Sequence, residues 1–272
     1  MAKACGKIIL SGEHGVVYGY PAIAQCIDRS VFVKVIPRGE PGLYFEPPNV
    51  KLRTLNSELF KQIAPKLVEL FGPEISHLCF QVQSDIPPGS GLGSSAALSV
   101  ALVRAIFEHN HEVLSQSDTV QYALELEKIF HGNPSGVDHT TIAAQSLIWF
   151  HQGRFENIRC LNPLHFRIST TATQAGTRAL ITAVRRNFEK NPRHIQTLFE
   201  NIACITFQMR DAIESNDRSA VGALMTKNHF LLQDLGVSTP ELDRLCESAK
   251  QEGALGAKLT GAGGGGSVIA LF

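Results

Sequence analysis

The sequence predicts a globular protein that mixes helices with antiparallel strands. The chain has 272 residues, of which 44% are hydrophobic and 18% are charged. It can therefore bury a substantial core and fill one large domain or two of ordinary size. Strand-like runs come before the first helical spacing, which favours antiparallel strands over a strand–helix–strand unit. A glycine-rich loop then leads directly into a run of helix-forming residues.

The first part of the chain contains four runs with strand composition, at residues 6–10, 16–24, 31–36 and 77–84. A turn cluster at 37–42 follows the third run. Between the third and fourth runs, leucine and isoleucine recur three or four residues apart over 51–71, which predicts a helix. Pro65 predicts a break in it, because proline lacks the backbone N–H that a helix interior uses.

Residues 85–97, Asp-Ile-Pro-Pro-Gly-Ser-Gly-Leu-Gly-Ser-Ser-Ala-Ala, are the stretch around which the chain is organised. Glycine permits positive φ and close approach of the backbone to a ligand, and a serine at the N-cap would start a helix over 96–107. A loop that opens a helix in this way is suited to binding phosphate. The alternative is an ordinary tight turn capped by serine. The pattern is neither a Walker A loop nor a dinucleotide fingerprint.

A second helix is predicted from Ser115 or Ser117 to Phe130, ending at Gly132. Its apolar stripe consists of Val120, Ala123, Leu124 and Phe130. Glu127 falls in the same sector, where an unpaired carboxylate would be costly. The residues alone leave two explanations open, an ion pair with a core arginine or lysine and a metal ligand.

The rest of the chain predicts a strand at 147–150, a crossing to a second domain near 151–165, and a strand at 179–184. Helices are predicted at about 192–215 and 217–234, and a third starts at Ser238 with a capping-box glutamate and ends at Gly253. Seven of the 23 glycines lie in 253–266, before a final strand at 267–272. So many glycines indicate a backbone that passes close to something.

Composition excludes several classes of protein. The 25 basic and 25 acidic residues balance, which argues against a generic nucleic-acid binder. No apolar run reaches membrane-spanning length, and the N-terminus lacks a signal-peptide pattern. The six cysteines stand singly, as expected for reduced thiols rather than a disulfide framework or a zinc site. These observations predict a cytoplasmic enzyme with no nucleic-acid or membrane partner.

Three separated segments, residues 6–24, 85–97 and 256–269, together resemble the GHMP kinases, the family of galactokinase, homoserine kinase, mevalonate kinase and phosphomevalonate kinase. Gly12-Glu13-His14-Gly15 is followed by Val-Val-Tyr-Gly and not by the Asp-Tyr pair of galactokinases. The turn at 130–138, Phe-His-Gly-Asn-Pro-Ser-Gly-Val-Asp, is also similar to a segment of mevalonate kinases. The resemblance is therefore strongest to the mevalonate kinase branch.

This resemblance implies a two-domain α+β fold, with a ribosomal-protein-S5-like domain over residues 1–155 and a ferredoxin-like domain over 156–272. The first domain would carry the ATP loop and the catalytic residues, and the second the later glycine-rich loop. It also implies phosphoryl transfer, a reaction that depends mainly on charge neutralisation and alignment.

The family's roles carry over residue by residue. Asp138 would take the proton of the substrate hydroxyl, with Lys7 beside it, and Ser95 and Glu127 would hold Mg²⁺. The implied ATP-binding residues are Asn49, Ser84, Pro88, Gly89, Ser90, Gly91, Leu92, Gly93, Ser94 and Ser95. The implied substrate-binding residues are Lys7, Glu13, His14, Asp138, Thr177, Gly261 and Ala262.

The resemblance predicts ATP-dependent phosphorylation of (R)-mevalonate to (R)-5-phosphomevalonate, with Mg²⁺ as the cofactor and ATP and mevalonate as small-molecule partners. Two alternatives stay open. One is another GHMP kinase, acting on phosphomevalonate or a sugar, and the other is a homologue that senses ligands without transferring phosphate. Retention of Lys7, Glu127 and Asp138 argues against the second. A homodimer is compatible with the sequence.

Overall fold

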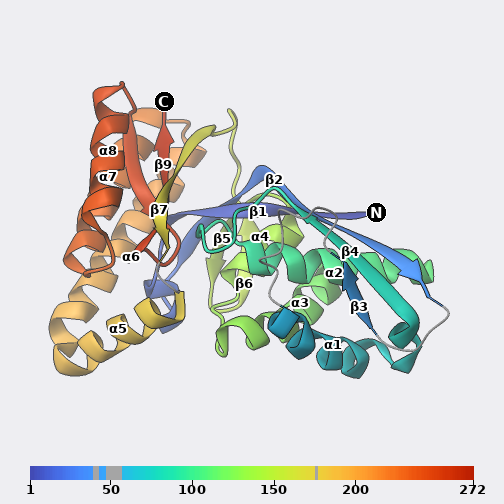
Figure 1. Ribbon diagram of the computed structural model, residues 1–272. Coiled ribbons are helices and arrows are strands. Elements are labelled where there is room, and N and C mark those ends of the chain that lie inside the picture. Colours follow the sequence, from blue (N-terminus) through green and yellow to red (C-terminus); the bar gives the residue numbers. More distant parts are fainter. Residues whose placement is uncertain (39–42, 47–56, 175–176) are drawn as a thin grey trace. The chain divides into compact units, whose positions relative to one another are not determined.

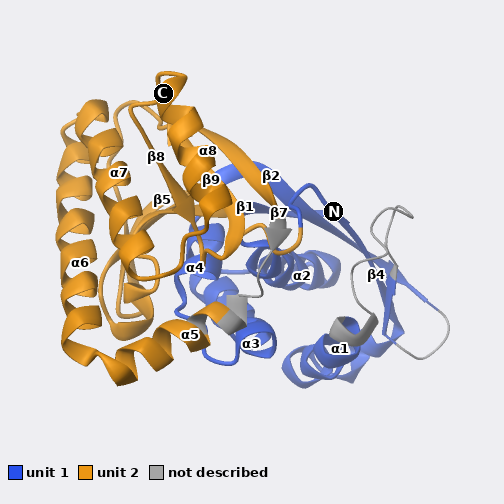
Figure 2. Ribbon diagram, turned by 60° about the vertical axis from the view of Figure 1, so that its left-hand side comes forward, with its two compact units in different colours: residues 1–6, 27–87, 93–144 blue, residues 7–26, 88–92, 145–272 orange. Residues whose placement is uncertain are grey.

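The computed structural model describes residues 1–38, 43–46, 57–174 and 177–272. The chain divides into two compact units that are interleaved along the sequence (Figure 2). Unit 1 consists of residues 1–6, 27–87 and 93–144, and unit 2 consists of residues 7–26, 88–92 and 145–272. The prediction divided the chain once, near residue 155, and that boundary between family domains stays a prediction.

The strands of unit 1 come from the first third of the chain (Figure 1). The later part of β2 (Ala22–Pro37) pairs antiparallel with β4 (Leu78–Ser84), with Val31 opposite Ser84. Strand β4 also pairs in parallel with the short β3 (Tyr44–Glu46). The fourth predicted strand is thus confirmed as β4, which leads directly towards the glycine-rich loop.

The helices of unit 1 are α1 (Ser57–Phe71), the 3₁₀ turn η3 (Pro73–His77), α2 (Ser94–Asn110), α3 (Gln116–His131) and α4 (Val137–Ala144). Helix α2 is buried on nearly all sides and contacts both α3 and α4, so it is the centre of this unit. The Ser115 side chain caps α3 by accepting a hydrogen bond from the N–H of Asp118, which confirms that predicted start.

Unit 2 contains two sheet arrangements. The first residues of β2 pair antiparallel with β5 (Leu147–His151), which pairs with β6 (Arg154–Asn157). A separate antiparallel sheet has the order β7–β9–β8, formed by β7 (Phe166–Gln174), β9 (Gly265–Leu271) and β8 (Gly256–Thr260). Strand β1 (Ala2–Ser11) pairs with β2.

The helices of unit 2 are α5 (Thr177–Lys190), α6 (Pro192–Glu214), α7 (Arg218–Asp234) and α8 (Pro240–Gln251). Helices α7 and α8 both pack on β8 (Figure 2). Leu242 and Cys246 of α8 join Leu259 and Val268 of the sheet in one buried cluster. Among the described residues, no helix is long and apolar enough to cross a membrane.

Four predictions about helices and strands were wrong. Residues 22–37 form one strand rather than two, and Gly15–Tyr18 is a 3₁₀ turn (η1) rather than strand. Helix α1 continues through Pro65, which lies on its exposed face, where water can hydrate the carbonyl that loses its partner. Residues 179–184 belong to helix α5, because a short apolar run suits a half-buried helix as well as a strand.

Candidate active site

The glycine-rich loop directs a series of carbonyl groups towards other residues of unit 2, the unit to which residues 88–92 belong. The Ser90 carbonyl accepts a hydrogen bond from Ser267 Oγ at 2.8 Å, and the Gly91 carbonyl accepts one from Lys7 Nζ at 3.1 Å. The Leu92 carbonyl accepts the backbone N–H of Lys7 at 2.9 Å. A trans peptide places its N–H opposite its C=O, so the N–H groups of the three following residues point the other way. Such a row of N–H groups is suited to binding an anion.

Gly91 is required by a close backbone contact. Its φ is +78°, and a Cβ atom at this position would lie 2.8 Å from the carbonyl oxygen of Thr260. Residues with a side chain rarely adopt this φ, and the carbonyl belongs to backbone that cannot rotate away. A larger residue would therefore distort the loop.

Helix α2 begins immediately after this loop, and its N-cap is Gly93 in a left-handed conformation. The predicted serine N-cap is wrong, because Ser94 and Ser95 already lie within the helix. A glycine has no side chain to accept the first N–H groups of the helix. Those groups and the helix dipole instead favour an external anion, such as a phosphate.

Ser95 and Glu127, the predicted metal ligands, lie together in unit 1. Ser95 Oγ donates a hydrogen bond to Glu127 Oε2 at 3.3 Å, and Ser99 Oγ donates one to Glu127 Oε1 at 3.2 Å. The Nε2 atom of His131 lies 3.0 Å from Ser95 Oγ and 3.6 Å from Glu127 Oε2. Glu127 is only 1% exposed. Its carboxylate therefore sits among polar groups within an otherwise apolar helix face.

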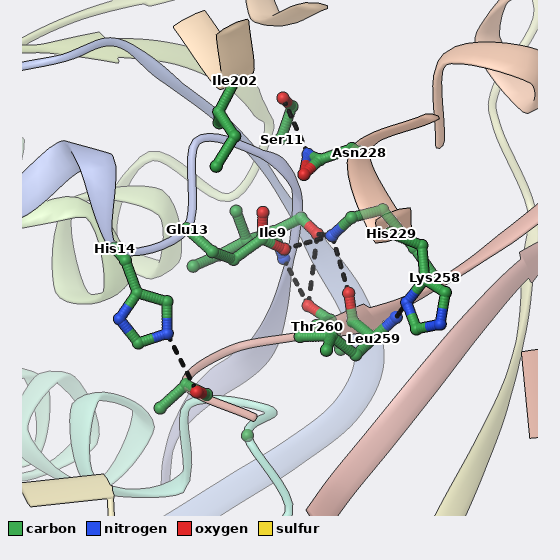
Figure 3. Close-up of polar contacts among 12 residues, drawn as sticks. Ile9, Ser11, Glu13, His14, Ile202, Asn228, His229, Lys258, Leu259 and Thr260 are labelled. Atoms are coloured by element: carbon green, nitrogen blue, oxygen red, sulfur yellow. Dashed lines mark hydrogen bonds and ion pairs between the residues drawn. The ribbon is translucent and has the colours of Figure 1, made fainter. Parts of the chain in front are cut away.

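Glu13 forms a buried ion pair with Lys258 of β8 (Figure 3). Lys258 is 0% exposed, and its Nζ also donates to the carbonyls of Ile9 and Leu259. Burial raises the pKa of Glu13 and lowers the pKa of Lys258, while each partner opposes the shift of the other. Lys258 was not among the site residues predicted from the sequence. The available signal was a lysine within an apolar strand next to the glycine cluster.

His14 occupies a strained turn beside this ion pair. Its φ is 60° and its ψ is −48°, and the N–H of Gly15 donates to the Glu13 carbonyl at 2.6 Å across it. This is a γ-turn, a conformation that is rare and strained for residues other than glycine. His14 Nε2 donates to the Ala262 carbonyl at 2.9 Å, and burial lowers the pKa of the ring. The structure thus brings three predicted substrate residues together: Glu13, His14 and Ala262.

Polar contacts also fix the backbone before this turn (Figure 3). Asn228 of α7 donates from Nδ2 to Ser11 Oγ at 3.0 Å, and Ser11 Oγ lies 2.7 Å from Thr206 Oγ1 of α6. In β8, Leu259 donates its N–H to His229 Nδ1 at 3.4 Å. The Glu13 turn and its partner strand are therefore both anchored to buried side chains of the helices.

Lys7 and Asp138, the predicted catalytic residues, belong to different units. Lys7 of β1 is 2% exposed and hydrogen-bonded to Gly91 as described above. Asp138 is the second residue of α4, directly after the turn that contains Gly136 with φ 95°. It is half-buried within unit 1. Each residue is thus held by regular structure in its own unit.

The structure describes the side chains of some of the other predicted residues but not of all. Ser84 Oγ donates to the Ile86 carbonyl at 3.0 Å and accepts the Ile86 N–H at 3.1 Å, so it shapes the chain entering the loop. Gly261 has φ +85°, and a Cβ there would lie 3.0 Å from the Gly91 carbonyl oxygen. Thr177 is the first residue of α5, but its side chain lies outside the described part. Asn49 lies outside the described residues.

Comparison with known proteins finds two family models along the chain. The model of the GHMP kinase N-terminal domain matches residues 58–146, and that of the GHMP kinase C-terminal domain matches residues 209–272. The mevalonate kinase of Pyrococcus abyssi is 33% identical over 100% of this chain and 88% of its own length. Human mevalonate kinase is 29% identical over 100% of this chain and 85% of its own length.

Among solved structures, the chain is similar to that of L. major mevalonate kinase in complex with R-mevalonate. The TM-score is 0.89 at 30% sequence identity, and the match covers 99% of this chain and 86% of the other.

Proposed function

The chain belongs to the GHMP kinase family, and from this premise we propose that it phosphorylates (R)-mevalonate to (R)-5-phosphomevalonate with ATP, in isoprenoid precursor biosynthesis. The observation that carries the proposal is the glycine-rich loop. Its carbonyls at Ser90, Gly91 and Leu92 face the protein, which leaves the opposite N–H groups to hold phosphate ahead of α2. The choice of mevalonate is supported by the relatives that match the whole chain, which are mevalonate kinases.

Mg²⁺ is the cofactor that we propose, with Ser95 and Glu127 as its protein ligands. Both offer oxygen, which suits a hard cation. Within the described residues, no three His, Cys, Asp or Glu side chains are grouped to hold a metal ion. That agrees with Mg²⁺, which is usually held by one or two carboxylates together with phosphate oxygens and water. Bound there, the ion would neutralise charge on the phosphates of ATP.

In the proposed mechanism, Asp138 takes the proton of the attacking hydroxyl, and Lys7 stabilises its carboxylate and polarises that hydroxyl. His14 and Glu13 orient the substrate, together with Thr177, Gly261 and Ala262. The contacts of Lys7 and Ser267 with the loop hold its N–H groups in place before ATP binds. Such preorganised donors are the main source of catalysis in phosphoryl transfer.

A coupled assay of ADP release tests this function. We expect turnover with (R)-mevalonate and little or none with phosphomevalonate, galactose or homoserine. Comparable kcat/KM for one of those three would favour the alternative kinase. ATP and mevalonate binding without ADP release would favour a ligand-sensing homologue. The Asp138→Asn variant serves as the inactive control.

We further propose that the protein works in the cytoplasm, without nucleic acid or a membrane as partner. None of its six cysteines, all of which lie among the described residues, forms a disulfide in the structure, which supports a reducing compartment. Cell fractionation with a tagged chain tests the location. The homodimer stays a prediction, and light scattering on the purified protein distinguishes it from a monomer.

A further inference from the structure

Three aromatic rings from separate elements of unit 2 stack on one another. Tyr18, the last residue of the η1 turn, stacks on Phe199 of α6 with ring centroids 4.8 Å apart and an interplanar angle of 28°. It also stacks on Phe188 of α5 at 5.2 Å and 30°. Phe199 is fully buried, whereas Tyr18 is 37% exposed. The Tyr18 ring therefore joins the turn to two helices without being part of the deep core.

The turn that carries Tyr18 is bonded to the strained residue His14. The Val17 N–H donates to the His14 carbonyl at 3.1 Å, and the Val16 N–H donates to the Gly12 carbonyl at 3.1 Å. After the turn, His151 Nε2 donates to the Gly19 carbonyl at 3.1 Å. Strained backbone persists only where its surroundings hold it firmly. A displacement of Tyr18 would thus reach the His14 backbone through one hydrogen-bonded turn.

Few of the α5 side chains that the structure describes are buried within unit 2. Of those that the structure describes between 180 and 190, only Val184 is buried, and Leu180 and Phe188 are half-buried. Segments with few buried contacts open locally at low free-energy cost. Among the described contacts of α5, the stack of Phe188 on Tyr18 therefore helps to fix the helix, whose first residue is Thr177.

We propose that Tyr18 is a positioning residue for the acceptor substrate. Its ring holds the His14 turn in its strained conformation and joins that turn to α5. The turn and the start of α5 thereby keep one geometry before the substrate binds. This inference rests on the proposed function, since it assigns the acceptor substrate to the His14 side of the protein. Tyr18 acts through its neighbours and not by touching reacting atoms.

Steady-state kinetics of Tyr18→Ala, Tyr18→Phe and Phe230→Ala test the proposal. Tyr18→Ala should raise the KM for mevalonate about tenfold and change the KM for ATP less than about twofold, because only the His14 turn is loosened. Tyr18→Phe keeps the stack and should behave like wild type. Phe230, in α7, is 54% exposed and is the matched control, whose loss should change neither constant. An unchanged KM for mevalonate in Tyr18→Ala, or equal impairment of Tyr18→Phe, would overturn the proposal.

A second variant separates positioning from stability. Phe188→Ala should raise the KM for mevalonate as Tyr18→Ala does, and the double variant should be little worse than the worse single one, because both remove the same stack. Amide hydrogen exchange in α5 should be faster in both variants, while the melting temperature falls by only a few degrees. Independent effects of the two substitutions would contradict the proposal. So would a lowered melting temperature accompanied by equal rises in the KM for mevalonate and the KM for ATP. A wild type that does not phosphorylate mevalonate would instead refute the proposed function.

Discussion

Replacing Lys258 by methionine is the most informative test of how the Glu13 turn is held. Lys258 and Glu13 are 0% and 1% exposed, and Glu13 Oε2 has no hydrogen-bond partner among the described residues. Lys258→Met keeps the length of the side chain but removes its charge. The carboxylate of Glu13 would then be buried without the ammonium group that compensates it.

The expected cost follows from this burial. Removing one partner of a buried ion pair costs about 3–5 kcal/mol, because the other charge is left uncompensated. That is a large share of the roughly 5–15 kcal/mol by which a domain is stable. Glu13→Gln should cost somewhat less, since Lys258 keeps the carbonyls of Ile9 and Leu259. The double variant contains neither charge of the pair, so it should cost only about 1–2 kcal/mol.

Urea unfolding followed by tryptophan fluorescence measures these costs. The chain has a single tryptophan, Trp149 of β5, which lies in unit 2 together with the ion pair. The matched control is Lys250→Met, since Lys250 is 40% exposed and forms a surface pair with Glu247 at 3.5 Å. It should cost less than about 1 kcal/mol. Additive effects of the two ion-pair variants would refute the reasoning, because uncoupled residues do not share a buried charge.

Three further predictions concern unit 1. Burial lowers the pKa of His139 from 6.5 to about 4, so the unfolded chain binds the proton more tightly than the folded chain does. The free energy of unfolding should therefore fall by about 3 kcal/mol as the pH drops from 7 to 4, and His139→Gln should flatten this pH dependence in unfolding experiments. Asp138→Asn should lower the single-turnover rate about 10²–10⁴-fold with ligand affinities kept, and near-normal turnover would exclude a base at this position. Glu127→Gln should raise the Mg²⁺ requirement, and Ser95→Ala should do so more mildly; a variant that unfolds yet keeps normal Mg²⁺ dependence would indicate a structural role.

Features with a local chemical cause were predictable from the sequence. Ser115 caps α3 because its hydroxyl accepts an N–H group three residues ahead, a signal contained within four residues. For α8 the predicted start at Ser238 was wrong by one residue, because Thr239 is the N-cap and accepts the Leu242 N–H. The buried position of Glu127 was predictable from its place in the apolar stripe of α3, and helical periodicity sets that position. Its partners Ser95 and Ser99 lie on another helix, so the residues alone could not choose between the two explanations.

Features that depend on distant parts of the chain were not predictable. Lys258 and Glu13 are 245 positions apart, and only the folded backbone brings them together. The apolar residues of 179–184 suit a strand as well as a helix, and the choice depends on what Val184 contacts in unit 2. The cap of α2 was assigned to a serine, but the chain needs positive φ at this point, which Gly93 provides.

The two glycine-rich segments lie against each other, and this close approach accounts for some of their glycines. From sequence alone, glycines at 89–93 and at 261–266 each indicated a backbone close to a ligand or to another chain segment. The structure shows that a Cβ at Gly91 would meet the Thr260 carbonyl, one at Gly261 would meet the Gly91 carbonyl, and one at Gly266 would meet the Ser90 carbonyl at 3.1 Å. Part of the glycine content is thus used for mutual approach of the two segments. This contact occupies the carbonyl side of the loop, so the N–H side is the one left for phosphate. Gly91→Ala should therefore weaken ATP binding, because it would displace the N–H groups of the loop without removing any group that contacts the nucleotide.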